Sequence, residues 1–269
     1  MKYKLIVSDL DGTLIPLRSE TLSTKTREIV SKIVESGVYF VPCTGRSFNC
    51  IPKEFEDLGT RFYIYANGAV IYDKMTHSFL RENYIELDCA LSVIDILKKY
   101  GILVYTFIDK DMYTDKFYFD KLCGNEEFSY FFSKATILDD LSTYIMDNKA
   151  KVQKISATLN PGEYDTVYQT INNIIPGLTI TSFTENNIEI LSEGSDKGTA
   201  LCFLCDSLEI NNEECAALGD SDNDIEMIKN AGLSIAPINA NDNVKMIANI
   251  IEGDANNDTF ADTLMKYIF

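Results

Sequence analysis

The sequence predicts an α/β protein whose core is a doubly wound, Rossmann-like parallel sheet, with an α+β domain inserted into it. Towards both ends of the chain, short apolar runs alternate with stretches that have the period of an amphipathic helix, as in parallel sheets. Residues 83–188 lack this alternation and are rich in Tyr and Phe. We therefore expect residues 1–82 and 189–269 to form the core domain, and residues 83–188 to form a separate, inserted domain.

The N-terminal elements are predicted to be a strand, a helix and a second strand. Residues 4–8 form a short apolar run that ends before a glycine turn, which is typical of a buried strand. Ser23 is placed to cap a helix that Gly37 ends, and the apolar stripe of this helix consists of Ile29, Val30, Ile33 and Val34. Residues 38–41 predict the second strand, which completes a β-α-β unit.

The remaining elements continue this pattern. Residues 62–66 and 69–72 predict two strands around Asn67-Gly68, a dipeptide typical of hairpins. In the C-terminal part we expect helices at residues 197–208, 223–230 and 244–250 and strands at residues 216–218 and 233–236. In the insertion we expect a helix at residues 87–99, a strand at residues 102–108 and a polar loop at residues 109–111.

The composition argues against several classes of function. The chain of 269 residues is 46% apolar and 24% charged, which is ordinary for a globular protein. Its 24 basic and 41 acidic residues give a net charge of −17, and this charge opposes binding to nucleic acid phosphates or to anionic membranes. An anionic ligand must therefore meet positive charge locally, at a metal, at a few cations or at helix N-termini.

The sequence also indicates a compartment. No apolar run approaches the roughly 18 residues that span a bilayer. The seven cysteines are an odd number without the spacing of a disulfide framework, which favours a reducing environment. We expect a cytoplasmic protein, a monomer or a weak homodimer, whose partner is a small molecule.

Four polar clusters lie where a parallel sheet places its ligands. They follow predicted strands or begin a helix: Asp9-Leu-Asp11-Gly-Thr13, Thr44-Gly45-Arg46, Lys197-Gly198 and Gly219-Asp220-Ser-Asp222-Asn223-Asp224. Each cluster alone is compatible with a simple turn or helix cap. Because ligands of open α/β sheets bind beyond the carboxyl ends of the strands, all four together predict one common pocket.

The residue types in these clusters suit phosphate chemistry. Five carboxylates at one end of a sheet would require a hard divalent cation such as Mg²⁺, and Mg²⁺ favours phosphate substrates; the five are Asp9, Asp11, Asp220, Asp222 and Asp224. The Thr44-Gly45 pair offers a hydroxyl group and backbone N–H groups to phosphoryl oxygens, and Lys197 adds a positive charge at a helix start.

A carboxylate that attacks a phosphate monoester is repelled by roughly 4 kcal/mol per charge pair at about 4 Å in an effective dielectric near 20. The metal and the lysine must offset this repulsion. Asp9 could then attack phosphorus and form an aspartyl-phosphate. Asp11, two residues further on, could protonate the leaving alcohol and then activate water.

The four clusters resemble the four motifs of haloacid dehalogenase-like hydrolases. The text Asn223-Asp-Ile-Glu-Met227, followed by Ala236-Pro-Ile-Asn-Ala240, is similar to the Cof-type sugar phosphatase branch. The resemblance covers essentially the whole chain, strongly in the core and weakly in the insertion. It implies that the insertion is a C2-type cap that closes over the active site and recognises the leaving group.

The resemblance implies a role for each residue of the chemical step. Asp9 would be the nucleophile and a Mg²⁺ ligand, and Asp11 would be the general acid and base, with its backbone carbonyl on the metal. Lys197 would neutralise the nucleophile and the phosphoryl oxygens. Asp220 would ligate Mg²⁺, and Asp224 would hold the metal or its waters.

The resemblance also implies a set of substrate contacts. Thr44, Gly45, Lys197 and Asn223 would bind the transferring phosphoryl group, and Arg46 would face the substrate or the cap. Asp11 favours phosphatase or phosphomutase chemistry, because P-type ATPases have Thr at this position and dehalogenases lack the carboxylate.

We expect a Mg²⁺-dependent phosphatase that acts on small phosphate monoesters through an aspartyl-phosphate. The resemblance implies that these are sugar or sugar-alcohol phosphates. The first alternative is a phosphomutase of the same fold, which would return the phosphoryl group to the substrate. The second is a non-catalytic protein that binds a phosphorylated metabolite and regulates a partner. The presence of both a candidate nucleophile and a candidate acid argues against this second alternative.

Overall fold

The computed structural model describes residues 2–17 and 19–269, which divide into two compact units. The first, here called the core unit, comprises the described residues up to Arg46 together with Ile51–Glu82 and Asp196–Phe269. The second, here called the inserted unit, comprises Asn83–Ser195 and the short segment Ser47–Cys50. The backbone N–H of Asn49 donates to the Lys110 carbonyl at 3.1 Å, which is one reason why this segment belongs with the insertion.

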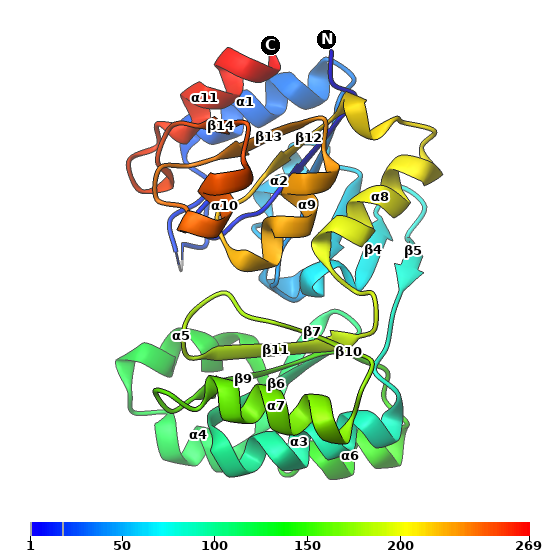
Figure 1. Ribbon diagram of the computed structural model, residues 1–269, viewed down its shortest axis with the longest axis vertical. Helices are drawn as coiled ribbons and strands as arrows, with labels where there is room; N and C mark the ends of the chain where they lie inside the picture. The colour runs from blue at the N-terminus through cyan, green and yellow to red at the C-terminus, as the bar shows by residue number, and fades with distance from the viewer. Residues whose placement is uncertain (1, 18) are drawn as a thin grey trace. The chain divides into compact units, whose positions relative to one another are not determined.

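A five-stranded parallel sheet forms the centre of the core unit (Figure 1). Its spatial order is β14-β13-β12-β1-β2. The strands are β1 (Leu5–Ser8), β2 (Tyr39–Pro42), β12 (Cys215–Leu218), β13 (Leu233–Ala236) and β14 (Ile250–Ile251). All four residues of β1 are buried, as its apolar run predicts.

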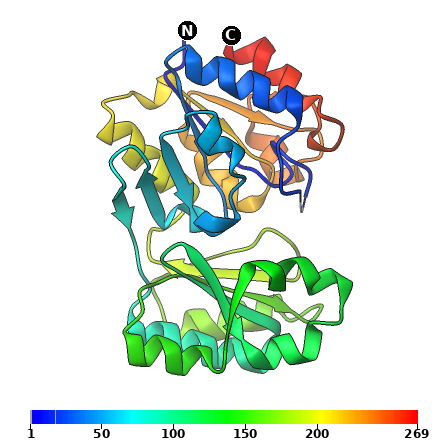
Figure 2. The ribbon, with the colours of Figure 1, turned by 180° about the vertical axis from the view of Figure 1, so that it is seen from behind.

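Helices cover both faces of this sheet, so the predicted doubly wound α/β core is confirmed. On one face lie α8 (Lys197–Ser207), α9 (Ile225–Asn230) and α10 (Asp242–Ile247), seen in front in Figure 1. On the other face lie α1 (Thr24–Glu35) and α11 (Phe260–Ile268), seen in front in Figure 2. The Ser23 hydroxyl accepts from the Thr26 N–H at 3.0 Å, so the predicted N-cap of α1 is confirmed.

A smaller antiparallel sheet completes the core unit. It consists of β3 (Phe62–Tyr65), β4 (Val70–Asp73) and β5 (Ser78–Glu82), and the short helix α2 (Glu54–Asp57) precedes it. Tyr65 pairs with Val70 across the turn that contains Asn67-Gly68, so the hairpin predicted from this dipeptide is confirmed.

The end of the chain differs from the sequence-based expectation. The predicted helix over residues 244–250 is wrong in its second half, because α10 ends at Ile247 and Ile250–Ile251 pairs in parallel with β13. A short apolar run is compatible with a helix and with a buried strand, and here the pairing with β13 determines that it is a strand. Helix α11, which the sequence reasoning did not predict, buries Phe260 and Leu264 and contacts α1.

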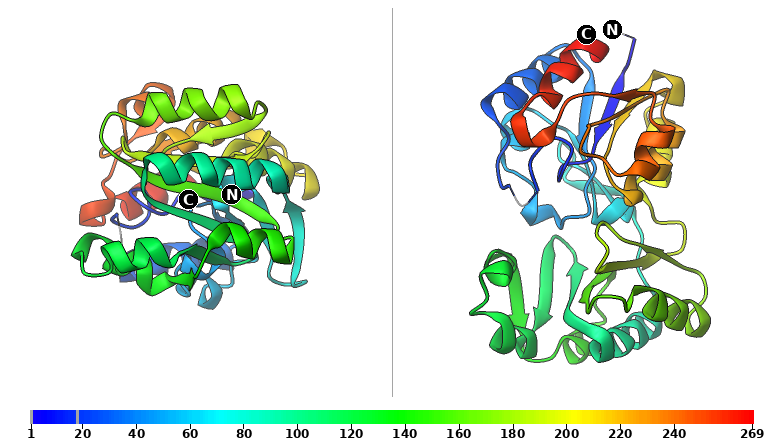
Figure 3. Two further views of the ribbon diagram at one scale, coloured as in Figure 1. Left: turned by 90° about the horizontal axis from the view of Figure 1, so that it is seen from below. Right: turned by 60° about the vertical axis from the view of Figure 1, so that its left-hand side comes forward.

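The inserted unit is an α+β domain with a six-stranded sheet of order β10-β11-β9-β6-β7-β8. The strands are β6 (Gly101–Ile108), β7 (Asp111–Asp115), β8 (Ala135–Leu138), β9 (Val152–Leu159), β10 (Leu178–Thr181) and β11 (Asn187–Ser192). The helices are α3 (Leu87–Tyr100), α4 (Lys116–Leu122), α5 (Glu126–Lys134), α6 (Leu141–Asn148) and α7 (Tyr164–Ile174). Helices α3, α6 and α7 lie along one face of the sheet (Figure 3).

The compact inserted unit continues beyond residue 188, where the sequence pattern placed its end. Strand β11 crosses that position and pairs with β9, and the unit ends at Ser195. Within this sheet, Lys154 Nζ donates to Glu189 Oε1 at 2.5 Å, and both side chains are buried. In the described part of the chain, no helix is both long enough and apolar enough to cross a membrane.

Candidate active site

Parallel strands bring distant parts of the sequence together at one edge of the core sheet. Asp9 follows β1, Thr44 follows β2, and Asp220 follows β12, which is the neighbour of β1 on the other side. The Asp9 N–H donates to the Leu218 carbonyl at 2.8 Å, so the ladder continues just beyond the strand. This edge is the carboxyl end of the strands, where the sequence predicted the pocket.

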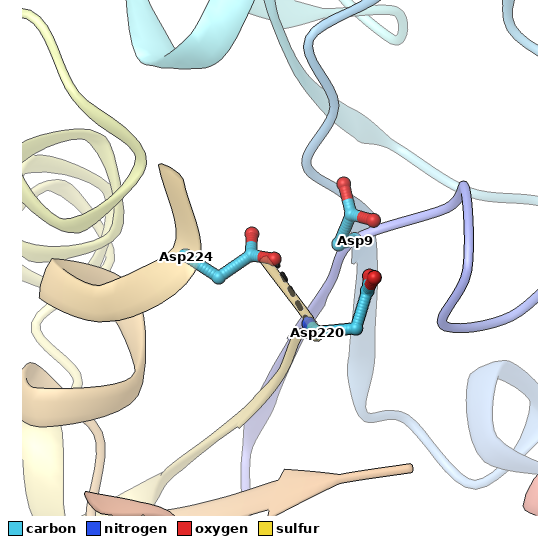
Figure 4. Close-up of side chains that lie close together, drawn as sticks. All are labelled: Asp9, Asp220 and Asp224. Carbon is cyan, nitrogen blue, oxygen red and sulfur yellow. Dashed lines mark hydrogen bonds between the residues drawn. The ribbon is translucent and has the colours of Figure 1, made fainter. Parts of the chain in front are cut away.

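Three carboxylates converge there (Figure 4). Asp9, Asp220 and Asp224 each offer one oxygen, and the three oxygens lie within 4.8 Å of one another. The exposed fractions of these residues are only 5%, 8% and 0%. Three buried carboxylates at this spacing repel one another strongly unless positive charge lies between them.

Lys197 supplies one such charge. It is the first residue of α8, and its side chain is fully buried. Its Nζ donates to Asp9 Oδ1 at 2.5 Å and to Asp224 Oδ1 at 2.7 Å. The adjacent Asp196 is the N-cap of α8 and accepts from the Thr199 N–H at 2.7 Å, as expected for a carboxylate at a helix start.

Hydrogen bonds fix Asp220 and Asp224 in their places. Asp224 Oδ2 accepts from the backbone N–H groups of Asp220 and Ser221, each at 3.0 Å (the first is dashed in Figure 4). Asp220 Oδ1 accepts from the Thr13 hydroxyl at 2.7 Å. Gly12 has a φ of +85°, and a Cβ there would lie 2.6 Å from Asp220 Oδ2, so only glycine allows this close approach.

Burial and charge perturb the ionisation of the cluster. Burial raises the pKa of Asp9 well above its usual range, because Lys197 offsets only part of the effects of burial and of the other carboxylates. Burial and the Asp224 charge raise the pKa of Asp220 to about 6. Burial alone would lower the pKa of Lys197, but Asp224 and Asp9 outweigh it and raise this pKa above its usual value.

The cluster has the composition of a divalent cation site. When all groups are ionised, three carboxylates face one ammonium, which leaves an excess of two negative charges in a buried space. Burial, and then the charges of the neighbouring carboxylates, raise the pKa values of Asp9 and Asp220. A hard cation of charge +2 with oxygen ligands would balance it.

Asp11 and Arg46 form a separate pair. Arg46 Nε and Nη2 donate to the two oxygens of Asp11 at 2.7 and 2.6 Å, and Nη2 also donates to the Ser19 carbonyl at 2.8 Å. The Asp11 side chain keeps 30% of its surface exposed, against 13% for Arg46. The guanidinium therefore holds the carboxylate by a bidentate contact. A contact of Arg46 with a phosphoryl oxygen stays a prediction.

The remaining residues of the predicted phosphate site lie beside the cluster. Thr44 is fully buried, and its hydroxyl oxygen accepts from the Arg46 N–H at 3.1 Å across Gly45. Asn223 lies in the turn Asp222–Asp224, and its Nδ2 donates to Asn67 Oδ1 at 3.1 Å.

Two of the five aspartates expected in one cluster point elsewhere. Asp11 lies on Arg46, and Asp222 Oδ1 accepts from the side chains of Asn241 and Asn243 at 2.8 and 3.0 Å. The expectation that all five crowd together is therefore wrong for Asp222, whereas Asp11 still lies close enough for its charge to raise the pKa of Asp9. Each has polar partners of its own, so neither carboxylate needs the common cation.

The structure adds residues that sequence reasoning did not select. Thr13 donates to Asp220, and Asn239 Nδ2 donates to the Gly12 carbonyl at 2.7 Å. Neither has a local sequence signal, because a hydroxyl beside aspartates and an amide in a loop are both common without any functional role. The Asn67-Gly68 dipeptide predicts a hairpin, but it does not indicate that Asn67 contacts the site.

Comparisons with known proteins show which proteins this chain is similar to. The model of a family described as haloacid dehalogenase-like hydrolase matches residues 6–264. A 5-amino-6-(5-phospho-D-ribitylamino)uracil phosphatase of Bacillus subtilis is 27% identical, over 92% of this chain and 89% of the relative. A pyridoxal phosphate phosphatase of Escherichia coli is 23% identical over the full length of both chains. A solved haloacid dehalogenase-like hydrolase from B. subtilis is 26% identical, with a TM-score of 0.84 over 99% of this chain and all of that one.

Proposed function

Because this chain belongs to the haloacid dehalogenase-like hydrolases and is a phosphatase of that family, we propose that it hydrolyses small phosphate monoesters through an aspartyl-phosphate on Asp9, with Mg²⁺ as cofactor. The membership agrees with the resemblance of the four motifs. One observation carries the proposal: Asp9 lies in a buried group with Asp220 and Asp224 and is bound by Lys197.

Asp9 has the surroundings that a carboxylate nucleophile needs. Lys197 lies against one of its oxygens and would also offset the negative charge of an approaching phosphoryl group. Because Lys197 is fully buried and held by two carboxylates, it cannot swing into solvent without breaking both contacts. The attacking oxygen of Asp9 would form a bond to phosphorus while the bond to the leaving alcohol breaks.

The carboxylates of Asp9, Asp220 and Asp224 would hold Mg²⁺, together with the Asp11 carbonyl that the motif implies. When bound, the ion supplies the positive charge that lets an anionic phosphate approach an anionic nucleophile. Thr13 and Ser221, through their contacts with Asp220, keep that carboxylate turned towards the cluster.

Asp11 would move the protons. In the first step it would give a proton to the oxygen of the leaving alcohol, and in the second it would take one from the water that attacks the aspartyl-phosphate. The bond between phosphorus and Asp9 then breaks and inorganic phosphate leaves. Because Arg46 binds both oxygens of Asp11, Asp11 must leave this contact and carry a proton before the first step. It loses that proton to the leaving alcohol and regains one from the attacking water, so one carboxyl group serves both steps.

The activity is tested with a generic aryl phosphate and Mg²⁺, measured as release of inorganic phosphate. We expect Asp9→Asn to reduce turnover at least about a thousandfold, since the amide is a poor nucleophile. Asp222→Asn is the matched control, because it removes a carboxylate of the fourth motif that lies outside the cluster, and it should retain wild-type turnover. Activity of the Asp9→Asn variant near the wild-type level would refute the covalent step.

The metal requirement is tested separately. EDTA should abolish turnover and excess Mg²⁺ should restore it, because the excess negative charge of the cluster is otherwise uncompensated. Full activity after exhaustive chelation would refute a metal-dependent mechanism.

We further propose that the substrates are sugar or sugar-alcohol phosphates and that the inserted unit is the cap that recognises them. The name of the B. subtilis relative contains a phosphorylated ribityl group, which supports this class, whereas that of the E. coli relative contains pyridoxal phosphate. A panel of phosphorylated metabolites, ranked by kcat/KM, decides between these classes.

A phosphomutase of the same fold stays the alternative. Product analysis separates the two reactions, because hydrolysis yields inorganic phosphate whereas a mutase yields an isomeric sugar phosphate. A protein that only binds a phosphometabolite would show neither product. We also propose a cytoplasmic location and a monomer or weak homodimer; the free thiols of all seven cysteines support the location.

A further inference from the structure

The turn between β3 and β4 has an unusual backbone. Ala66, Asn67 and Gly68 all have positive φ angles, of 49°, 52° and 90°. This region is unfavourable for residues with a Cβ, and Asn tolerates it better than Ala. Three successive residues keep such a conformation only where their surroundings hold it.

Two of the contacts that hold this turn come from the predicted phosphate loop. The Ala66 N–H donates to the Arg46 carbonyl, and the Asn67 N–H donates to the Thr44 carbonyl, both at 3.0 Å. The turn therefore fixes the backbone at both ends of the Thr44-Gly45-Arg46 loop.

A third contact comes from the helix that carries the catalytic lysine. A Cβ on Gly68 would lie 2.2 Å from the Asp196 carbonyl oxygen and 3.0 Å from the Lys197 nitrogen. The turn thus lies directly against the start of α8, and no residue larger than glycine fits there.

The Asn67 side chain reaches a fourth part of the site. It is 1% exposed, and its Oδ1 accepts from Asn223 Nδ2 at 3.1 Å. The Oδ1 of Asn223 is buried and has no hydrogen-bond partner among the residues that the structure describes. An amide nitrogen carries two hydrogens, so Asn67 uses one and fixes the direction of the other.

The direction of this second hydrogen matters for an anionic ligand. Without Asn67, the Asn223 amide could rotate by half a turn and present its carbonyl oxygen where the N–H group had been. An N–H group attracts a phosphoryl oxygen, whereas a carbonyl oxygen repels it.

We propose that Asn67 is a positioning residue of phosphoryl transfer, which orients the Asn223 amide towards the transferring group. The inference rests on the proposed function, because it assigns Asn223 to the phosphate site. Asn67 itself acts through Asn223 and does not touch the substrate.

The first test removes the amide and keeps the backbone. Asn67→Gly suits a positive φ, and it should lower kcat by about tenfold to a hundredfold while KM changes by less than about threefold. Glu209→Gly is the matched control, because Glu209 also has a positive φ, of 55°, and is exposed; it should leave kcat unchanged. A kcat of Asn67→Gly within about twofold of wild type would overturn the inference.

The second test asks whether Asn67 acts through Asn223. Once Asn223→Ala has removed that amide, the added Asn67→Gly change should lower kcat by less than about twofold. A loss in this background as large as in the wild type would overturn the inference, because it would mean that Asn67 supports the site in another way.

The third test does not depend on turnover. Calorimetry with Mg²⁺ and orthovanadate, which imitates the phosphoryl group in transit, should show about tenfold weaker binding for Asn67→Gly than for wild type. Unchanged vanadate binding would overturn the inference. Failure of the proposed function has a different signature, namely a wild type that releases no phosphate or an Asp9→Asn variant that does.

Discussion

Replacing Asp220 by asparagine should change how the stability of the metal-free protein depends on pH. Burial and Asp224 raise the folded-state pKa of Asp220 from 3.8 to about 6. Because folding raises this pKa, an ionised Asp220 lowers the free energy of unfolding. This cost is absent below the pKa of the unfolded state and fully present above the pKa of the folded state. The full cost is about 3 kcal/mol, from roughly two pKa units at about 1.4 kcal/mol each.

The expected signal follows from this window. At about pH 5 roughly half of the cost of about 3 kcal/mol is already present, so about 1.5 kcal/mol remains to be lost by about pH 7.5. Relative to Asp220→Asn, the wild type should therefore lose about 1.5 kcal/mol of unfolding free energy between these pH values, a relative fall in Tm of roughly 3–6 °C. The hydrogen bonds that the amide changes do not titrate in this range, so they cancel in the comparison.

The assay is thermal unfolding in EDTA, followed by circular dichroism at both pH values. Asp262→Asn is the control, because it removes an exposed carboxylate of the same charge, paired with Lys25, and should follow the wild type. Saturating Mg²⁺ should stabilise the wild type more at the higher pH, where the carboxylates are ionised. A wild-type-minus-Asp220→Asn difference that stays constant with pH would refute this electrostatic account of the cluster.

Three further predictions concern the same cluster. Lys197→Met should lower kcat at least about a hundredfold, and Lys197→Arg should not restore it, because the fully buried site leaves no room for a larger guanidinium; steady-state rates on an aryl phosphate decide this. Gly12→Ala should weaken Mg²⁺ binding at least about tenfold by calorimetry, whereas Gly37→Ala, with the same positive φ but nothing within 4 Å, should not. Mg²⁺ affinity should fall by up to about tenfold per pH unit below about pH 6, because protons compete for Asp220, and a pH-independent affinity would contradict this.

The sequence allowed the core sheet and the cation cluster to be predicted because both depend on local patterns. Strands β1 and β12 are short apolar runs that end directly before aspartates, and parallel pairing brings their ends together. The places of Asp9 and Asp220 follow from this pattern alone.

The choice of side-chain partners did not follow from the sequence. Asp11 and Asp9 stand two residues apart, yet one binds Arg46 and the other binds Lys197. Which cation a carboxylate meets depends on how loops pack, and no local pattern records that. The helix predicted over residues 244–250 includes Ile250 for a related reason, since a strand of two residues has no period of its own and exists only through its pairing with β13.

The most direct test of the covalent mechanism is to trap the phosphorylated enzyme. Rapid acid quench with a ³²P-labelled monoester substrate, followed by peptide mapping, should place the label on Asp9 within the first turnover. In Asp11→Asn, which lacks the base for the second step, the label should accumulate and decay slowly. Absence of label during rapid turnover in both proteins, or label on a residue other than Asp9, would contradict phosphoryl transfer to this aspartate.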